Sequence, residues 1–161
     1  MATFYIIDGP DGAGKTTLVK KIIEANPGAI TMHFSKPNSD EEAFNYWKVY
    51  LEALKKSAGA SVVIFDRSWY SDMVYGPVMR GREEMTKENM ETLELAVRAL
   101  GGGLILYCTG KPEVLWRRCK QRGEVYIDRF EQLKALHDKY EEVMRLPKYL
   151  PVVRYDTTVR W

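Results

Sequence analysis

The sequence lacks the features that would mark a secreted or membrane protein. Only two of its 161 residues are cysteines, Cys108 and Cys119, and no CxxC pair or secreted disulfide framework is present. No apolar run approaches the roughly 20 residues that a bilayer span requires. The N-terminus also lacks the charged and apolar regions of a signal peptide. We therefore expect a cytoplasmic protein with reduced, structural thiols and no membrane partner.

A charge of one sign is missing as well. The 24 Lys and Arg residues nearly balance the 22 Asp and Glu residues, which leaves a net charge of +2. Such a small excess does not by itself favour a nucleic acid or a membrane surface as a partner. The length, the 45% apolar content and the absence of repeats or linkers predict a single domain over residues 1–161.

Apolar strand patterns alternate with helical patterns along the chain. The predicted strands are residues 3–8, 29–34, 61–66, 104–109 and 152–156. The predicted helices are residues 16–26, 40–57, 86–100, 113–121 and 129–145. In helix 40–57, Phe44, Trp47, Leu51 and Leu54 form the expected buried stripe. Nearly apolar strands separated by helices predict an α/β fold with three layers, in which helices cover both faces of a parallel five-stranded sheet.

The first predicted strand runs directly into a phosphate-binding loop. Residues 9–16, GPDGAGKT, fit the pattern G-x-x-x-x-G-K-[ST] at each fixed position, with a strand before and a helix after. Glycines let backbone N–H groups approach phosphate oxygens, and the following helix presents its positive end. The predicted ATP-binding residues in this loop are Gly9, Asp11, Gly12, Ala13, Gly14, Lys15, Thr16 and Thr17. Lys15 is expected to reach the β- and γ-phosphates, and the Thr16 hydroxyl to bind Mg²⁺.

A carboxylate ends the strongest buried strand, residues 61–66. Asp66 stands where a P-loop protein can meet the nucleotide-bound Mg²⁺, directly or through water. The base-reading signature Asn-Lys-x-Asp is absent, which argues against a GTPase switch. A small P-loop protein of this kind suggests phosphoryl transfer to a small acceptor.

Two further segments resemble known nucleotide kinases. Residues 66–75, DRSWYSDMVY, are similar to the D-R-x-x-x-S-x-x-x-Y segment of thymidylate kinases, and their core resembles the E-R-S-x-Y-S-D motif of deoxynucleoside kinases. Residues 118–123 with 128–131 are similar to the arginine-rich lid of both families, and residues 136–141 to the deoxynucleoside kinase version. The chain is identified as a compact, phage-type member of this P-loop kinase superfamily, with a P-loop NTPase fold and a lid at about residues 117–130.

The resemblance implies roles for individual residues. Arg67 is expected to touch the acceptor phosphate, Asp11 the sugar 3′-hydroxyl, and Tyr75 the position of a ribose 2′-hydroxyl. Ser71 belongs to the same acceptor segment. Arg118 and Arg122 are four residues apart, so they share one helix face and are expected to clamp the transferred phosphoryl group. Arg129 either joins this clamp or pairs with Asp128 or Glu131.

Other acceptor residues keep alternatives. Phe34 and Trp47 are placed to stack on a base, although Trp47 also fits the core. Asp72 meets either a base edge or the N-terminus of a helix. Lys36 contacts either the acceptor phosphate or solvent. Both histidines, His33 and His137, are expected to be structural because they lack metal-ligating neighbours.

The leading hypothesis is that ATP and a deoxynucleoside monophosphate give ADP and a diphosphate, with Mg²⁺ as cofactor. Its catalytic residues are Lys15, Asp66, Arg67, Arg118 and Arg122. A deoxynucleoside kinase is the first alternative, but residues 33–37, HFSKP, lack the glutamate that family places before the proline to activate a 5′-hydroxyl. A carboxylate from residues 40–42 keeps this alternative open. A kinase acting on polynucleotide ends or hydroxymethylpyrimidine DNA is the second alternative, with residues 80–82 as a basic turn, and a homodimer is left open.

Overall fold

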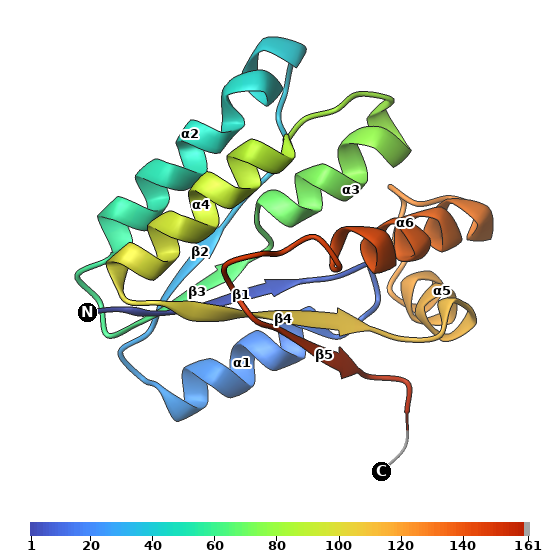
Figure 1. The fold of residues 1–161 in the computed structure, drawn as a ribbon. Coiled ribbons are helices and arrows are strands. Elements are labelled where there is room, and N and C mark those ends of the chain that lie inside the picture. The colour runs from blue at the N-terminus through green and yellow to red at the C-terminus, as the bar shows by residue number, and fades with distance from the viewer. Residues whose placement is uncertain (160–161) are drawn as a thin grey trace.

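A single parallel sheet forms the centre of the computed structural model, which describes residues 1–159 (Figure 1). Its strands are β1 (Thr3–Asp8), β2 (Ile30–His33), β3 (Val62–Asp66), β4 (Gly103–Thr109) and β5 (Val152–Asp156). They lie in the order β2-β3-β1-β4-β5, and every pair is parallel. The predicted five-stranded parallel sheet is therefore confirmed.

Helices cover both faces of this sheet. They are α1 (Lys15–Ala25), α2 (Asp40–Ser57), α3 (Trp69–Arg80), α4 (Lys87–Leu100), α5 (Pro112–Gln121) and α6 (Phe130–Val143). Figure 1 shows α1 on one face and α2, α3 and α4 on the other, while α5 and α6 lie toward the edge where the strands end. The three-layer α/β architecture expected from the sequence is confirmed. None of the helices within residues 1–159 is both long and apolar enough to cross a membrane.

Strand β1 lies in the middle of the sheet. It is flanked by β3 and β4, and its residues Phe4, Ile6 and Ile7 are fully buried between the helix layers. Because all strands are parallel, their carboxyl ends meet at one edge, where backbone turns expose functional groups. The loop after β1 and the segment after β3 therefore lie side by side, and the candidate site is built there.

Helix α3 is the element that sequence periodicity missed. Its first eight residues, 69–76, are all buried, so the segment has no polar face to reveal a helical period. It also contains Gly76 and Pro77, which normally argue against a helix interior. The helix begins at Ser68, whose hydroxyl caps the Tyr70 N–H at 3.3 Å. The motif that resembles nucleotide kinases is thus a buried helix.

The buried stripe of α2 differs from the expected one. Phe44 is 76% exposed and Trp47 is only partly buried, whereas Tyr46 and Tyr50 face the core. Both tyrosines bury their rings because their hydroxyls find partners, the Ser35 carbonyl at 2.7 Å and the Asp72 carboxylate at 2.5 Å. An apolarity count cannot foresee this, because it scores tyrosine below phenylalanine and tryptophan.

The two cysteines are free and buried, as expected for structural thiols. Burial raises the pKa of Cys108 to about 11, so its thiol stays protonated at neutral pH.

Candidate active site

The loop between β1 and α1 adopts a conformation that only glycine permits at its two ends. Gly9 has φ 148°, and a Cβ there would lie 1.9 Å from the Cys108 carbonyl oxygen. Gly14 has φ 85° and precedes α1, which begins with no side-chain cap. Its first N–H groups are consequently available to an anion at the positive end of the helix.

Lys15 is folded into this loop. Its Nζ donates to the carbonyl oxygens of Gly9 and Pro10, both at 2.8 Å, and the residue is buried. Burial, followed by the nearby Arg67 charge, lowers the pKa of Lys15 to about 8. The ammonium group is therefore held at the loop, ready to exchange carbonyl contacts for phosphate oxygens.

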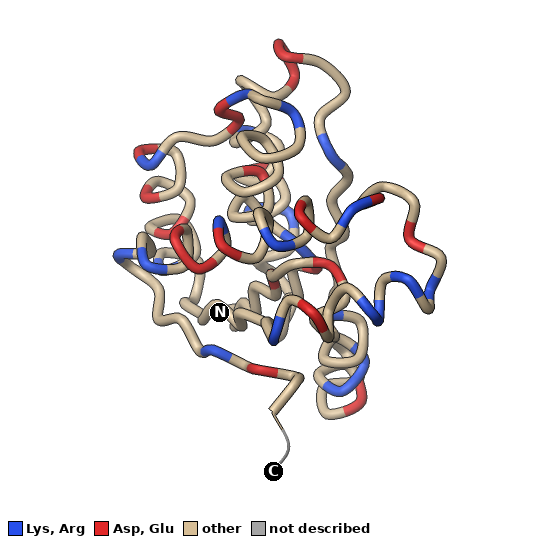
Figure 2. The backbone as a smooth tube through the Cα atoms, turned by 90° about the vertical axis from the view of Figure 1, so that its right-hand side faces the viewer, with Lys and Arg blue, Asp and Glu red and all other residues tan. Residues whose placement is uncertain are grey.

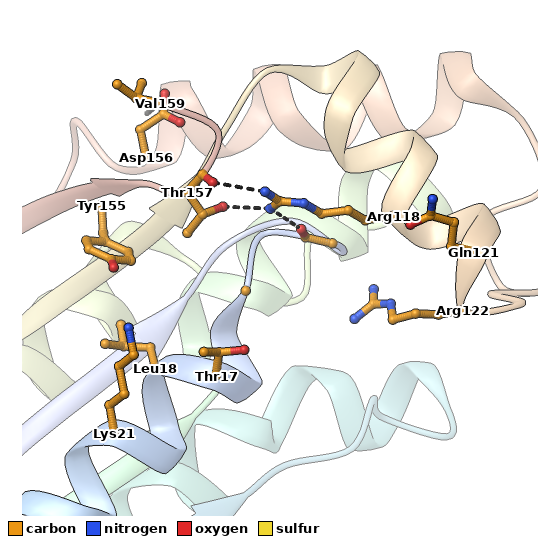
Figure 3. Close-up of a pocket in the computed structure, with 12 residues that line it drawn as sticks. Thr17, Leu18, Lys21, Arg118, Gln121, Arg122, Tyr155, Asp156, Thr157 and Val159 are labelled. Atoms are coloured by element: carbon orange, nitrogen blue, oxygen red, sulfur yellow. Dashed lines mark hydrogen bonds between the residues drawn. The ribbon is translucent and has the colours of Figure 1, made fainter. Parts of the chain in front are cut away.

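A cavity of about 530 Å³, called the donor cavity because predicted ATP-binding residues line it, opens beside the loop (Figure 3). Arg118 spans it: its guanidinium donates to the Gly12 carbonyl at 3.0 Å and to the Thr157 carbonyl and hydroxyl oxygens at 2.9 and 2.8 Å. Arg122 lies on the same side, as its spacing from Arg118 predicted. The remaining lining residues include Thr17, Leu18, Lys21, Gln121, Tyr155, Asp156 and Val159. Thr157 and its neighbours follow β5 and carried no sequence motif.

A second, acceptor cavity of about 220 Å³ lies on the other side of the loop. Seven of the residues predicted for the acceptor line it: Asp11, Phe34, Lys36, Arg67, Ser71, Asp72 and Tyr75. Six further residues complete the wall: His33, Ser35, Tyr50, Ser68, Arg80 and Tyr126. Residues from five separate segments of the chain thus meet around one hollow.

Arg67 stands between the P-loop and the acceptor cavity. It is the one non-glycine among residues 1–159 with positive φ, 67°, and its N–H donates to the Ile7 carbonyl at 2.9 Å. Its side chain makes five hydrogen bonds of 3.2–3.4 Å, to Gly9, Asp11, Ser71, Tyr75 and Tyr140. A strained backbone that holds a cation at a cavity is a frequent feature of functional sites.

The surroundings of Arg67 keep it charged. Burial alone lowers the pKa of an arginine, but Tyr75, Tyr140 and the acids nearby raise the pKa of Arg67 well above its ordinary value. Burial also acts against ionised Asp11, yet Arg67 and Lys15 hold the pKa of Asp11 below its usual range. Asp11 accepts from the Tyr75 hydroxyl at 2.5 Å and from Arg67 at 3.2 Å. Both charges persist at neutral pH.

Asp72 lies at the back of the acceptor cavity, only 4% exposed. Its Oδ2 accepts the Tyr50 hydroxyl at 2.5 Å, and burial raises the pKa of its carboxyl to about 7. Ser68, not Asp72, caps the N-terminus of α3. The base-edge interpretation of Asp72 is therefore the one that its position favours.

Asp66 and Thr16, the two residues predicted to bind Mg²⁺, line neither of the two cavities. Asp66 ends β3, its side chain is 24% exposed, and its Oδ2 is 3.3 Å from the His33 Nδ1. Thr16 is exposed in the first turn of α1. Residues 1–159 hold no cluster of three or more acidic, histidine or cysteine ligands. Mg²⁺ does not require one, because it commonly takes one or two protein oxygens and completes its shell with phosphates and water.

Comparison with known proteins identifies the family. Residues 2–100, more than half of the chain, match the family Polyphosphate kinase 2 (PPK2). The chain belongs to the PPK2 family. It is a phosphotransferase of the nucleotide kinase type, and the predicted P-loop kinase superfamily is confirmed.

Relatives agree with this assignment at different lengths. The SPbeta prophage-derived protein YorR of Bacillus subtilis is 27% identical over 88% of this chain and 82% of its own. A putative GDP-polyphosphate phosphotransferase of Corynebacterium glutamicum is 40% identical, and an ADP-polyphosphate phosphotransferase of Rhizobium meliloti is 37% identical. Each of these two matches covers 41% of this chain but only 21–22% of the other protein.

Solved structures share the fold. YorR in complex with phosphorylated GDP superposes with a TM-score of 0.75 at 26% identity, covering 96% of this chain and 86% of YorR. A deoxyadenosine kinase from M. mycoides superposes with a TM-score of 0.61 at 20% identity, covering 96% of this chain and 90% of the kinase. The similarity to the deoxyadenosine kinase supports only the fold of this chain.

The structure bears on three residues whose roles the sequence left open or gave as structural. Trp47 does not line the acceptor cavity: it lies on α2 between the buried tyrosines and the exposed face, and it packs against the rim of the core. His33 is not packed in the core: its side chain is 71% exposed at the cavity wall, where its Nδ1 lies 3.3 Å from Asp66 Oδ2. Arg129 lies outside both cavities, 70% exposed and 3.7 Å from Asp128, so the pairing alternative describes it.

Asp8 is a site residue that the sequence interpretation overlooked. It is fully buried and accepts four hydrogen bonds, from the Gly9 N–H and from the hydroxyls of Ser68, Ser71 and Tyr140, at 2.6–2.9 Å. It thereby joins the start of the P-loop to α3 and α6. The available signal was its type and place, an acid at the end of a buried strand directly before the glycines.

Proposed function

We propose that this PPK2-family protein transfers the γ-phosphoryl group of ATP to the phosphate of a nucleoside monophosphate. The observation that carries the proposal is Arg67, a charged guanidinium between the P-loop and the acceptor cavity. All five of its side-chain hydrogen bonds are long, 3.2–3.4 Å, so a phosphate offering shorter, charge-assisted contacts would replace some of them at little loss. Lys36 at the cavity mouth supplies a second cation.

The donor cavity supports ATP as the donor. It continues past the P-loop into a space lined by Leu18 and Tyr155, which suit the faces of a nucleobase. The flat guanidinium of Arg118 borders the same space and is fixed by three hydrogen bonds. A donor made only of phosphates would leave these apolar surfaces without a partner.

The remaining residues divide the catalytic work between them. Thr16 and Asp66 would hold Mg²⁺, which neutralises charge on the donor phosphates when bound. Lys15 and Arg122 stabilise the charge that develops on the transferred phosphoryl group. The attacking oxygen of a monophosphate is already anionic, so no side chain has to remove a proton from it. The two carboxylates that line the acceptor cavity already accept tyrosine hydroxyls, Asp72 from Tyr50 and Asp11 from Tyr75, which fits such an acceptor.

Inorganic polyphosphate is a second candidate donor, and the family itself favours it. Two relatives carry names that describe nucleotide–polyphosphate phosphotransfer. Polyphosphate would bind the same P-loop and leave the base region of the donor cavity empty. The YorR structure with phosphorylated GDP supports nucleotide binding in a chain of this length.

A nucleic-acid acceptor has weaker support. Arg80 and Arg82 both bind Glu84, and Arg82 also binds Asp40, so the predicted basic turn is neutralised. Figure 2 shows Lys and Arg interspersed with Asp and Glu on the side where the strands end. DNA-binding surfaces instead gather one sign of charge.

The deciding experiment supplies each donor with each acceptor. Labelled ATP or polyphosphate is incubated with Mg²⁺ and a nucleoside, its monophosphate or a DNA duplex. We expect transfer from ATP to the monophosphate, at a rate well above transfer to the nucleoside or to DNA. Faster transfer to the nucleoside would overturn the acceptor, and transfer from polyphosphate alone would overturn the donor.

Arg67→Ala provides the matched test of the acceptor contact. Removing a buried, hydrogen-bonded charge costs about 2 kcal/mol or more, so the KM for the monophosphate should rise about 30-fold while the Kd for ATP changes little. Arg145→Ala, which removes an exposed arginine on the loop after α6, is the control and should behave as the unmodified protein. An unchanged monophosphate KM in Arg67→Ala contradicts the proposal.

A further inference from the structure

Asp8 takes the protons of two hydroxyls that lie against Arg67. The hydroxyls of Ser71 and Tyr140 each donate to the Asp8 Oδ1 at 2.6 Å. Each hydroxyl oxygen also lies 3.3 Å from the Arg67 Nη1. A hydroxyl has one proton to donate and two lone pairs that accept. Because the short bonds to Asp8 use the protons, both hydroxyls turn lone pairs toward the guanidinium.

Tyr140 is well suited to this arrangement. It is fully buried on α6, and burial, followed by the nearby Asp8 charge, raises the pKa of its hydroxyl well above the usual value. The hydroxyl therefore keeps the proton that it donates. Its ring packs against Tyr107 and Tyr75, with centroids 6.0 and 6.2 Å away, which fixes the position of the oxygen. Tyr140 thus presents a fixed acceptor to Arg67.

The other terminal nitrogen of Arg67 rests on a second pair of the same kind. Its Nη2 donates to Asp11 at 3.2 Å and to the Tyr75 hydroxyl at 3.4 Å. That hydroxyl in turn donates to Asp11 at 2.5 Å. This pair lines the acceptor cavity, whereas Asp8 and Tyr140 are fully buried and line neither cavity. A phosphate that enters the cavity can displace the first pair from Arg67 but cannot reach the second.

We propose that Asp8 and Tyr140 are positioning residues that hold Arg67 for the acceptor phosphate, a role that rests on the phosphate contact proposed above. Asp8 directs a lone pair of Tyr140 to Nη1, which anchors the guanidinium from its buried side. The cavity side of the guanidinium is then able to exchange Asp11 for phosphate oxygens without losing its orientation. Neither positioning residue touches the substrate. Helix α6 thereby contributes to acceptor binding although none of its residues lines the acceptor cavity.

The role makes a prediction that distinguishes it from support of the fold. Arg67 is the cation that would contact the phosphate, so loosening it should weaken binding of a monophosphate and leave its neutral nucleoside unaffected. A residue that only stabilises the fold would weaken both ligands alike. The informative quantity is therefore the ratio of the two affinities.

The test uses Tyr140→Phe, which keeps the ring and removes the hydroxyl. Calorimetry without a donor measures the Kd values of dAMP, dCMP, dGMP and dTMP and of the four corresponding nucleosides. Phosphorylation of the same panel with ATP is measured in parallel. We expect the affinity for the best-bound monophosphate to fall about tenfold, which equals about 1.4 kcal/mol, while the Kd values for its nucleoside and for ATP stay unchanged.

Tyr107→Phe is the matched control. The Tyr107 hydroxyl donates to Glu141 at 3.0 Å, so this buried tyrosine also links a strand to α6, but it does not contact Arg67. The control should keep the ratio of the unmodified protein. Circular dichroism compares the stability of the two variants. If Tyr140→Phe does not fold, Ser71→Ala removes the other hydroxyl that Asp8 turns toward Arg67, and it should lower the same ratio.

A double-mutant cycle shows whether Tyr140 acts through Arg67. In the Arg67→Ala background, Tyr140→Phe should cause no further loss of monophosphate affinity, because the group that it positions is gone. Additive losses, or a ratio in Tyr140→Phe equal to that of the unmodified protein, would overturn the positioning role and leave the proposed function standing. If no monophosphate binds or reacts with ATP, the proposed function fails and the positioning role fails with it.

Discussion

At the scale of single residues, the P-loop lysine, Lys15, has a pKa so low that it loses its charge only slightly above neutral pH. Its pKa of about 8 arises from burial and from Arg67, and its Nζ contacts only carbonyl oxygens of its own loop. Below that pH Lys15 is a cation that phosphates attract. Above it, the amine is neutral until a bound phosphate draws a proton back.

Affinity for ATP should therefore fall as the pH rises through about 8 in the unliganded protein. Calorimetric Kd values measured from pH ~7 to ~9 test this, since the last phosphate ionisation, with a pKa of about 6, is nearly complete in that range. Lys15→Ala should lose about 10²–10³-fold in turnover while retaining its circular dichroism spectrum. A pH-independent Kd or a Lys15→Ala variant with near-normal turnover contradicts the P-loop assignment.

Tyr75 offers a second test at this scale. Its hydroxyl donates to Asp11 at 2.5 Å, and Arg67 lies 5.1 Å above the ring centroid, so the ring is locked at the cavity wall. If this ring occupies the space of a 2′-hydroxyl, deoxynucleotides should react faster than ribonucleotides. Tyr75→Ala should narrow that difference in kcat/KM, whereas Tyr75→Phe, which keeps the ring, should preserve it. Equal rates for both sugars in the unmodified protein exclude the role.

Sequence motifs and resemblance predicted seven of the residues that line the acceptor cavity but not the other six. The P-loop and Arg67 follow from fixed spacings, because phosphate chemistry requires particular residue types in one short segment. Arg80, Tyr126 and His33 belong to three elements that only the folded chain brings together. Their neighbours in sequence contain no pattern that distinguishes them from surface residues.

At the scale of elements, helix α3 determines the shape of the acceptor cavity. Gly76 lies on its buried face, where a Cβ would be 2.8 Å from both the Arg82 carbonyl oxygen and the Glu84 Cγ. Glu84 thus occupies the space that a side chain at position 76 would fill, and from there it orients Arg80. Gly76, which made the helix hard to predict from the sequence, therefore leaves the space that the buried Glu84 side chain occupies.

Gly76→Ala should accordingly weaken the acceptor site. Alanine favours a helix by about 1 kcal/mol over glycine, but the contact with a backbone carbonyl costs about 1–3 kcal/mol and displaces Glu84. We expect a lower melting temperature and a higher monophosphate KM, with ATP binding retained. Gly59→Ala, where a Cβ meets nothing within 4 Å, is the matched control. An unchanged monophosphate KM in Gly76→Ala would show that the position of Glu84 does not affect the acceptor site.

The order of the helices and strands was easier to predict than which face of each helix is buried. All five strands and five of the six helices follow from apolar periodicity, with ends shifted by one or two residues. Thr86 caps α4, and its hydroxyl accepts from the Asn89 N–H at 3.1 Å. The prediction of the buried stripe of α2 was wrong because two tyrosine hydroxyls donate to groups outside the helix. The sequence of α2 alone contains no sign of those partners.

At the scale of the whole molecule, one buried carboxyl links stability to pH. Burial is the largest cause of the raised pKa of Asp72; Glu84 and Asp8 raise it further, while the Tyr50 hydrogen bond and Arg80 lower it, to a net value of about 7. Between pH ~4 and ~7 the folded protein therefore keeps a proton that the unfolded chain releases. This group's contribution to stability falls as the pH rises across that window and is constant above it.

Asp72→Asn should remove this dependence. Relative to the unmodified protein, the variant should gain stability at pH ~8, on the order of 3 kcal/mol, and little at pH ~4. Urea unfolding of both proteins at the two pH values measures the difference. Equal differences at both pH values would contradict the raised pKa, and Asp138→Asn serves as the exposed-carboxyl control.

The central place of β1 also bears on how the chain acquires its activity during synthesis. Thr3 pairs with Val62 in β3, and Phe4 pairs with Gly103 in β4. The two strands that flank β1 are therefore synthesised about 60 and 100 residues after it. Pairing between such distant segments is slow compared with local helix formation. The P-loop leaves the ribosome about 100 residues before Cys108, whose carbonyl oxygen packs directly against Gly9 in the folded loop. We therefore expect a nascent chain to bind phosphate only after β4 has been translated.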